Sequence, residues 1–87
     1  MKQYMVVERF KPECIKAVYE RYRSRGRMLP EGLNYLNSWV NQELNICYQL
    51  METSDLSLFS QWTRQWDDLI EFEIVPIDGP PQEENRA

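Results

Sequence analysis

The pattern of residues 2–26, KQYMVVERFKPECIKAVYERYRSRG, predicts the first strand and the first helix of the fold. Residues 2–10 are rich in β-branched and aromatic side chains, which predicts a strand that ends before Pro12. Over residues 13–25, apolar side chains recur at the spacing of one helical face: Ile15, Val18, Tyr19 and Tyr22. Gly26 is the expected stop of this helix.

The rest of the chain continues this succession of strand and helix patterns. LNYLNSWV (33–40) alternates imperfectly and predicts a second strand, and ICYQLMET (46–53) predicts a third that forms a hairpin with it. Residues 70–77, IEFEIVPI, alternate cleanly and predict a fourth strand. Between them, residues 54–66 predict a second helix with an apolar stripe of Leu58, Phe59, Trp62 and Trp66.

The predicted order β-α-β-β-α-β specifies a ferredoxin-like fold of the α+β class. Right-handed crossovers give one antiparallel sheet of four strands, in the spatial order 4-1-3-2, with both helices on one face. We expect a single domain over residues 1–77 and a disordered polar tail over residues 78–87. Because the first and third strands are apolar on both faces, the open face of the sheet needs a cover. The expected cover is the same face of a second copy.

The composition of the 87-residue chain excludes several classes of function. There is no histidine, which removes Ser-His-Asp and Cys-His catalysis, histidine metal ligands and a histidine pH switch. The two cysteines, Cys14 and Cys47, are far apart, so we expect reduced thiols in a cytoplasmic protein, with no metal and no cofactor. No apolar run approaches the ~20 residues that a membrane span needs.

Charge is unevenly spread along the chain. Residues 1–27 hold eight basic and three acidic side chains, whereas residues 28–87 hold two basic and eleven acidic ones. The net charge is −4, while nucleic-acid-binding domains are usually basic. The asymmetry favours charge pairing within the molecule or between subunits over nucleic-acid binding.

Three arginines, Arg23, Arg25 and Arg27, alternate at the end of the first predicted helix. In one interpretation, Arg25 and Arg27 complement the negative end of the helix and pair with Glu52 or Glu31. In the other, the three arginines form an anion site for a carboxylate or phosphate ligand. The chain has no glycine-rich phosphate loop, so the sequence favours the structural interpretation.

Carboxylates inside the predicted strands are the weak catalytic candidates, namely Glu8 and Glu52. Antiparallel pairing of the first and fourth strands would bring Glu8 towards Glu71 and Glu73, and two close carboxylates raise a pKa and make a general acid or base. The sequence favours the structural interpretation, in which Glu71 and Glu73 simply face solvent or an arginine such as Arg9.

The remaining candidates are ligand-binding residues. Gln49 lies among apolar neighbours and is expected to hydrogen-bond across a subunit interface. Trp62 and Trp66 fit the core, whereas Trp39 either packs on a partner or lines a cavity. Together with Arg27, we take Trp39, Gln49 and Trp62 as the residues of a ligand site.

Four segments, YMVVERFK, VYERYRSRGRMLPEGLNYLNSWV, CYQLMETSD and WTRQWDDLIEFEIVPI, resemble a family of short bacterial proteins of unknown function. The resemblance covers residues 4–77, and that family is similar to a branch of the dimeric α/β-barrel group. It implies a homodimer whose sheets pack face to face, and it implies no reaction. Wider relatives include cofactor-independent monooxygenases, muconolactone isomerases and haem-degrading enzymes, whose histidine ligand has no counterpart here.

Two functions remain open. The first is a cytoplasmic homodimer that binds a small molecule or a protein partner without chemistry, which the missing catalytic constellation favours. The second is a cofactor-independent monooxygenase or isomerase acting on a small aromatic or lactone. In that case Glu8 or Glu52 serves as base, Arg27 holds an anionic group, and Trp39 and Trp62 shape the pocket.

Overall fold

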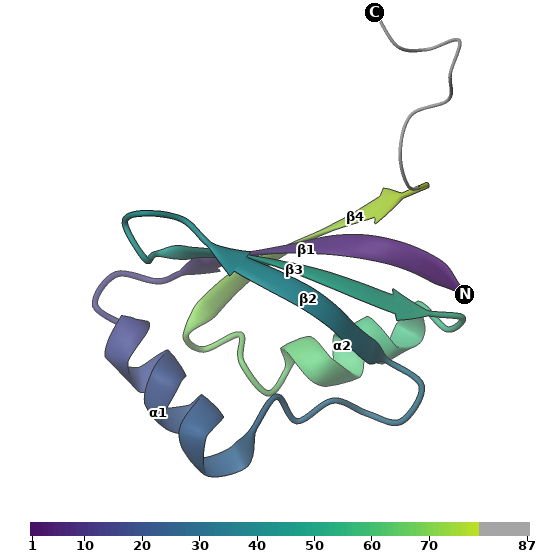
Figure 1. Cartoon of the computed structure of the whole chain (residues 1–87). Helices are drawn as coiled ribbons and strands as arrows, with labels where there is room; N and C mark the ends of the chain where they lie inside the picture. Colours follow the sequence, from purple (N-terminus) through teal and green to yellow (C-terminus); the bar gives the residue numbers. More distant parts are fainter. Residues whose placement is uncertain (79–87) are drawn as a thin grey trace, which may run out of the picture.

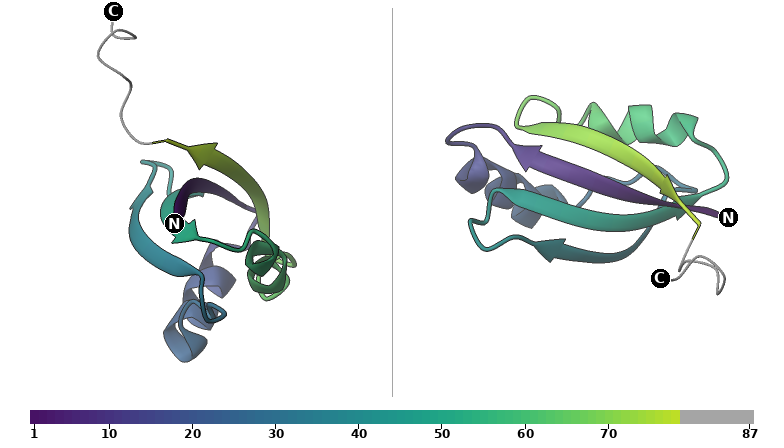
Figure 2. Two further views of the ribbon diagram at one scale, coloured as in Figure 1. Left: turned by 90° about the vertical axis from the view of Figure 1, so that its right-hand side faces the viewer. Right: turned by 90° about the horizontal axis from the view of Figure 1, so that it is seen from above.

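The computed structural model describes residues 1–78 and follows the predicted order β-α-β-β-α-β; residues 79–87, most of the predicted tail, lie outside the described part. The elements are β1 (Lys2–Phe10), α1 (Ile15–Arg25), β2 (Asn34–Val40), β3 (Ile46–Thr53), α2 (Ser57–Thr63) and β4 (Ile70–Ile77). All four strands pair antiparallel in one sheet, in the order β2-β3-β1-β4. Both helices lie on the same side of this sheet (Figure 1, Figure 2). The ferredoxin-like fold is therefore confirmed.

The departures from the predicted elements have local causes. The register of β2 against β3 shifts between Tyr35 and Asn37, so Leu36 is an extra residue that breaks the alternation. α1 begins at Ile15, slightly later than expected, because the backbone of Glu13 has a φ of 64°, outside the α-helical region. α2 is shorter than its apolar stripe, since it ends at Thr63 and turns follow it.

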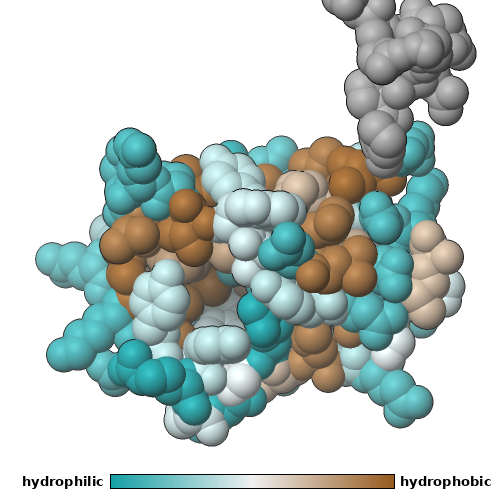
Figure 3. Space-filling view, viewed as in Figure 1, coloured by the Kyte–Doolittle hydropathy of each residue, from teal (hydrophilic) through white to brown (hydrophobic). Residues whose placement is uncertain are grey.

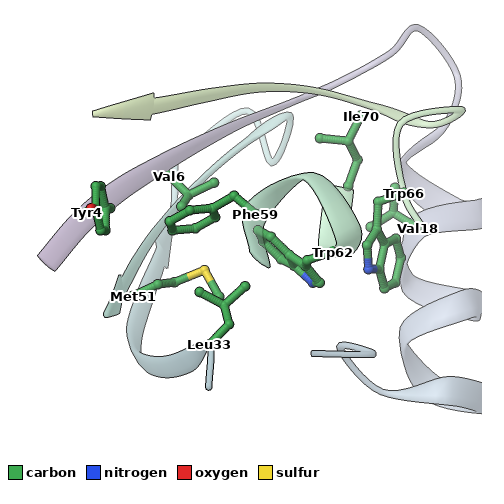
Figure 4. Packing of buried hydrophobic residues seen from close by; sticks show 9 residues of the cluster. All are labelled: Tyr4, Val6, Val18, Leu33, Met51, Phe59, Trp62, Trp66 and Ile70. Carbon is green, nitrogen blue, oxygen red and sulfur yellow. The ribbon is translucent and has the colours of Figure 1, made fainter. Parts of the chain in front are cut away.

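The core fills the space between the inner face of the sheet and the helices (Figure 4). Phe59 of α2 packs edge-on against Tyr4 of β1, with the ring centroids 5.1 Å apart. Among the residues of α1, Val18 alone belongs to the buried cluster, so α1 is packed less fully than α2. The cluster consists of Tyr4, Val6, Val18, Leu33, Met51, Phe59, Trp62, Trp66 and Ile70.

The other face of the sheet, which we call the open face, has no helix over it within residues 1–78 (Figure 2). In register there, Met5 lies opposite Leu50, and Tyr48 lies between Val7 and Trp39. Trp39 is 50% exposed and Tyr48 is 37% exposed. β1 and β3 are thus apolar on both faces, as the sequence indicates, and the cover expected for the open face stays a prediction.

Candidate functional site

A cavity of about 140 Å³ lies between the inner face of the sheet and the two helices. Its walls are largely aromatic and apolar, and its polar groups come from the strands and from the connection between α1 and β2. A concave apolar site with a few convergent polar groups is typical of small-molecule binding. The lining residues are Glu8, Phe10, Val18, Tyr19, Tyr22, Arg27, Ser38, Val40, Cys47, Gln49, Trp62, Trp66 and Ile70.

The mouth of the cavity lies between α1 and β2. Tyr22 and Val40 both line the cavity and are each 42% exposed. The surface is hollowed in this region, and apolar surface is visible in the hollow (Figure 3). The sequence placed Tyr19 and Tyr22 on a core stripe, but both remain partly exposed at the rim, where a tyrosine keeps its hydroxyl in contact with water.

Three polar side chains of the cavity form one hydrogen-bonded chain, which we call the relay. Nε2 of Gln49 donates to Oε2 of Glu8 at 3.1 Å, and Nε of Arg27 donates to Oε1 of Gln49 at 3.3 Å. Glu8 is 7% exposed and Gln49 is 4% exposed, and both point to the inner face of the sheet. Gln49 was expected to bond across a subunit interface, but both partners belong to its own chain.

Arg27 is fixed in the cavity at both its side chain and its backbone. Its guanidinium lies over the ring of Tyr35, 3.6 Å from the centroid, and its Nη1 donates to the hydroxyl of Tyr22 at 3.3 Å. Its backbone carbonyl accepts the indole N–H groups of Trp62 and Trp66, at 2.9 Å and 3.0 Å. The connection after α1 is thereby anchored to the indoles of Trp62 and Trp66.

Burial sets the protonation of the groups in the cavity. It raises the pKa of Glu8 from 4.5 to about 7, and the nearby positive charge of Arg27 opposes part of this rise. Burial, together with the neighbouring Glu8, raises the pKa of the Cys47 thiol to about 12, so this thiol is neutral at physiological pH. Near neutral pH, Glu8 is therefore the group of the relay that gains or loses a proton.

Four of the six candidate residues come together in the cavity, and two do not. Trp39 pairs with Tyr48, and Glu52 pairs with Gln3, and these positions point to the open face. The cavity is built without Trp39 and Glu52. The four that line it are Glu8, Arg27, Gln49 and Trp62.

The catalytic interpretation, in which Glu8 clusters with Glu71 and Glu73, is wrong. Glu8 pairs with Phe72 and points to the inner face, whereas Glu71 and Glu73 point to the open face. The raised pKa of Glu8 therefore comes from burial and not from a second carboxylate. The interpretation that the sequence favours is confirmed for Glu73, because its carboxylate pairs with Arg9 at 3.0 Å.

The three arginines at the end of α1 and just after it do not lie together in the structure. Arg23 and Arg25 lie exposed in the last turn of α1, where they complement the negative end of the helix. Arg27 turns inward to the relay. The expected pairing of Arg25 and Arg27 with Glu31 or Glu52 is wrong, since none of these four takes part in an ion pair within residues 1–78.

Within residues 1–78, no group of three or more histidine, cysteine, aspartate or glutamate side chains is arranged to hold a metal ion. In the same part of the chain, no helix is long and apolar enough to cross a membrane.

A model of the protein family described as Domain of unknown function (DUF3303) matches residues 2–78. The chain belongs to this family. The DUF3303 region includes all six elements and every residue of the cavity, so the site belongs to the family domain. No curated protein and no solved structure matches the chain. The expected resemblance to a family of unknown function is confirmed to that extent.

The sequence reasoning missed several residues that build the DUF3303 cavity. Tyr22 and Tyr35 hold the guanidinium of Arg27, and Cys47 lies beside Glu8 on the inner face. One signal was available for Cys47, which stands two residues before Gln49 on the same strand and so shares its face. The tyrosines carried no such signal, because their contacts depend on the path of the chain after α1.

Proposed function

We propose that this DUF3303 protein binds a small ligand, about the size of a single ring, in the cavity between sheet and helices. The observation that carries the proposal is the combination of aromatic walls with the Glu8–Gln49–Arg27 relay inside one cavity. Its volume of about 140 Å³ is close to that of an apolar protein cavity, on the order of 150 Å³, that binds benzene. A polar substituent on the ring would face the relay.

The two cysteines provide a matched pair of variants to test this site. Cys47→Leu places extra carbon atoms in the cavity, whereas Cys14→Leu places them outside it, at a position that makes no side-chain capping bond. The test screens benzoate, phenol and benzyl alcohol by NMR and uses the indole signals of Trp62 and Trp66 as reporters of binding. At least one compound should shift these signals in the unaltered protein and in Cys14→Leu, but not in Cys47→Leu. Equal shifts in both variants would contradict a site in the cavity.

The alternative function is an isomerase or a cofactor-independent monooxygenase acting on a small lactone or aromatic. It is favoured by the pKa of about 7 at Glu8, since a general base works best when its pKa lies near the operating pH. For a β,γ-unsaturated butenolide such as α-angelica lactone, Glu8 would remove the proton next to the carbonyl and return it to the γ carbon. Arg27 would stabilise the intermediate oxyanion. Formation of the conjugated isomer that Glu8→Gln abolishes would favour this alternative over binding alone.

The proposal includes a homodimer formed through the open face. The support is the apolar surface there, including Tyr48 and Trp39, on strands whose other face is already packed. Because Glu8 and Arg27 lie on the inner face, each subunit would keep a complete cavity. Both cysteines are free thiols, which fits the reducing cytoplasm as the proposed location.

A further inference from the structure

The relay leaves hydrogen-bonding capacity free at both of its ends. Glu8 is bonded through Oε2, and Arg27 is bonded through Nε and Nη1, so Oε1 of Glu8 and Nη2 of Arg27 have no partner within residues 1–78. No fully buried side-chain nitrogen or oxygen in this part of the chain lacks a partner. These two free atoms therefore touch accessible space, and both residues line the cavity.

Arg27 takes part in no ion pair within residues 1–78. The ion pairs within residues 1–78 join other residues, and the neutral amide of Gln49 stands between the guanidinium and Glu8. A cation held by two tyrosine rings in a largely apolar cavity favours a ligand that brings one negative charge. A phosphate monoester would bring nearly two charges to this single arginine, beside a carboxyl group, so a carboxylate fits better.

We infer that the ligand is a single-ring monocarboxylate, whose carboxylate is held between the guanidinium of Arg27 and the protonated carboxyl of Glu8. The inference rests on the proposed function and names the ligand class of that site. One ligand oxygen accepts from Nη2 of Arg27, and the other accepts the O–H of Glu8, while the ring lies against the aromatic walls. Two carboxyl groups this close share one proton, because both cannot be ionised at low cost.

Binding is therefore coupled to the uptake of a proton by Glu8. The groups that face Glu8 are Gln49 and Cys47 on β3, Arg27 on the connection, and Tyr19 and Tyr22 on α1. On β4, on α2 and on the turns after α2, the facing residues are apolar or aromatic and carry no charge, namely Ile70, Phe72, Trp62 and Trp66. Burial raises the pKa of Glu8 to about 7, so Glu8 changes charge between pH 6 and pH 8, whereas burial keeps the Cys47 thiol neutral.

The test compares benzoate with benzyl alcohol, a neutral compound of similar shape, by calorimetric titration of the intact protein at pH 6. We expect benzoate to bind at least about tenfold more tightly, which corresponds to ~1.4 kcal/mol. Arg27→Gln should abolish the preference, and Arg25→Gln, a change in an exposed arginine of the same segment, should leave it unchanged. Benzoate titrations at pH 8 in buffers of different ionisation enthalpy should report uptake of about one proton by the unaltered protein.

Glu8→Gln supplies a permanent neutral donor at the same position, so its benzoate affinity should not change between pH 6 and pH 9. In the unaltered protein the affinity should fall by about tenfold per pH unit above the pKa of Glu8. Benzyl alcohol binding as tightly as benzoate, or an unchanged preference in Arg27→Gln, would overturn the ligand class while leaving the cavity as a binding site. Absence of proton uptake would overturn the role of Glu8, and failure of both compounds to bind would overturn the proposed function as well.

Discussion

At Glu8, the cost of burying a charge makes the stability of the protein depend on pH. The pKa of this carboxyl is about 7 in the folded chain and 4.5 when it is solvated, so the folded state holds the proton more tightly. The contribution of Glu8 to stability is therefore fully present below pH 4.5, falls as the pH rises towards 7, and is lost above that. The difference between these two pKa values corresponds to about 3 kcal/mol of unfolding free energy.

We predict that Glu8→Gln removes the loss of stability that accompanies a rise in pH from 4.5 to 7. The amide can still accept the hydrogen bond from Gln49 but cannot ionise, so the variant should be more stable than the unaltered protein at pH 8, by up to about 3 kcal/mol. Urea denaturation at pH 4.5, 6 and 8 measures the difference. Glu52→Gln, on the open face, is the matched control and should keep the pH dependence of the unaltered protein. A Glu8→Gln profile parallel to that of the unaltered protein would contradict the buried carboxyl.

Among the elements, α1 is attached to the rest of the domain through the side chain of Arg21. Arg21 forms a two-fold hydrogen bond with the carboxylate of Asp68, at 2.8 Å and 2.7 Å, and donates to the carbonyl of Gln65 at 2.8 Å. Its guanidinium also lies 5.5 Å from the ring centroid of Trp66. These contacts attach α1 to the turns after α2, while the cavity lies beside the helix.

Removing the contacts of Arg21 should increase local opening of α1 more than it lowers the free energy of unfolding of the whole domain. Arg21→Gln should lower the unfolding free energy by about 1 kcal/mol or less, since the carboxylate of Asp68 is largely exposed. It should also raise the pKa of Asp68, which the hydrogen bond from Arg21 holds below its ordinary value. Hydrogen exchange of α1 amides and a carboxyl titration measure both effects. Arg23→Gln is the control on the same helix, and equal exchange rates in the two variants would contradict the attachment of α1 through Arg21.

The elements also show where sequence reasoning succeeds and where it ends. β1, β3 and β4 lie where the sequence predicts them, because alternation and β-branched side chains specify a half-buried strand locally. A stripe on α1 indicates which face is apolar, but not how far the helix stands from the sheet, and that distance makes the cavity. The cluster of carboxylates does not form for a simpler reason. Glu8 and Glu73 lie on adjacent strands, but their side chains point to opposite faces of the sheet.

Across the whole molecule, the two faces of the sheet differ in what they carry. The inner face packs the core and the cavity, and the open face carries apolar side chains on its central strands. A partner sheet would bury Tyr48 and its neighbours without altering the relay. The assembly could be proposed from the sequence because β1 and β3 are apolar at successive positions, whereas its geometry could not.

We predict that Tyr48→Glu abolishes the proposed homodimer and leaves a monomer that still folds. The side chain lies at the centre of the open face and is partly exposed in the single chain, so a charge there is tolerated in the monomer and costly in a dimer. Sedimentation equilibrium at micromolar concentration gives the mass. Leu56→Glu, at an exposed position outside the sheet, is the control and should remain dimeric. A monomeric mass for the unaltered protein would contradict the assembly.

Burial of Glu8 in the cavity predicts a carboxyl group that exchanges its proton near neutral pH. The most direct test is an NMR titration of the side-chain carboxyl carbon of Glu8 in the intact protein. We predict a midpoint at about pH 7, from burial beside the relay. A midpoint near 4.5, the value of a solvated carboxyl, would mean that Glu8 faces water and would contradict the site.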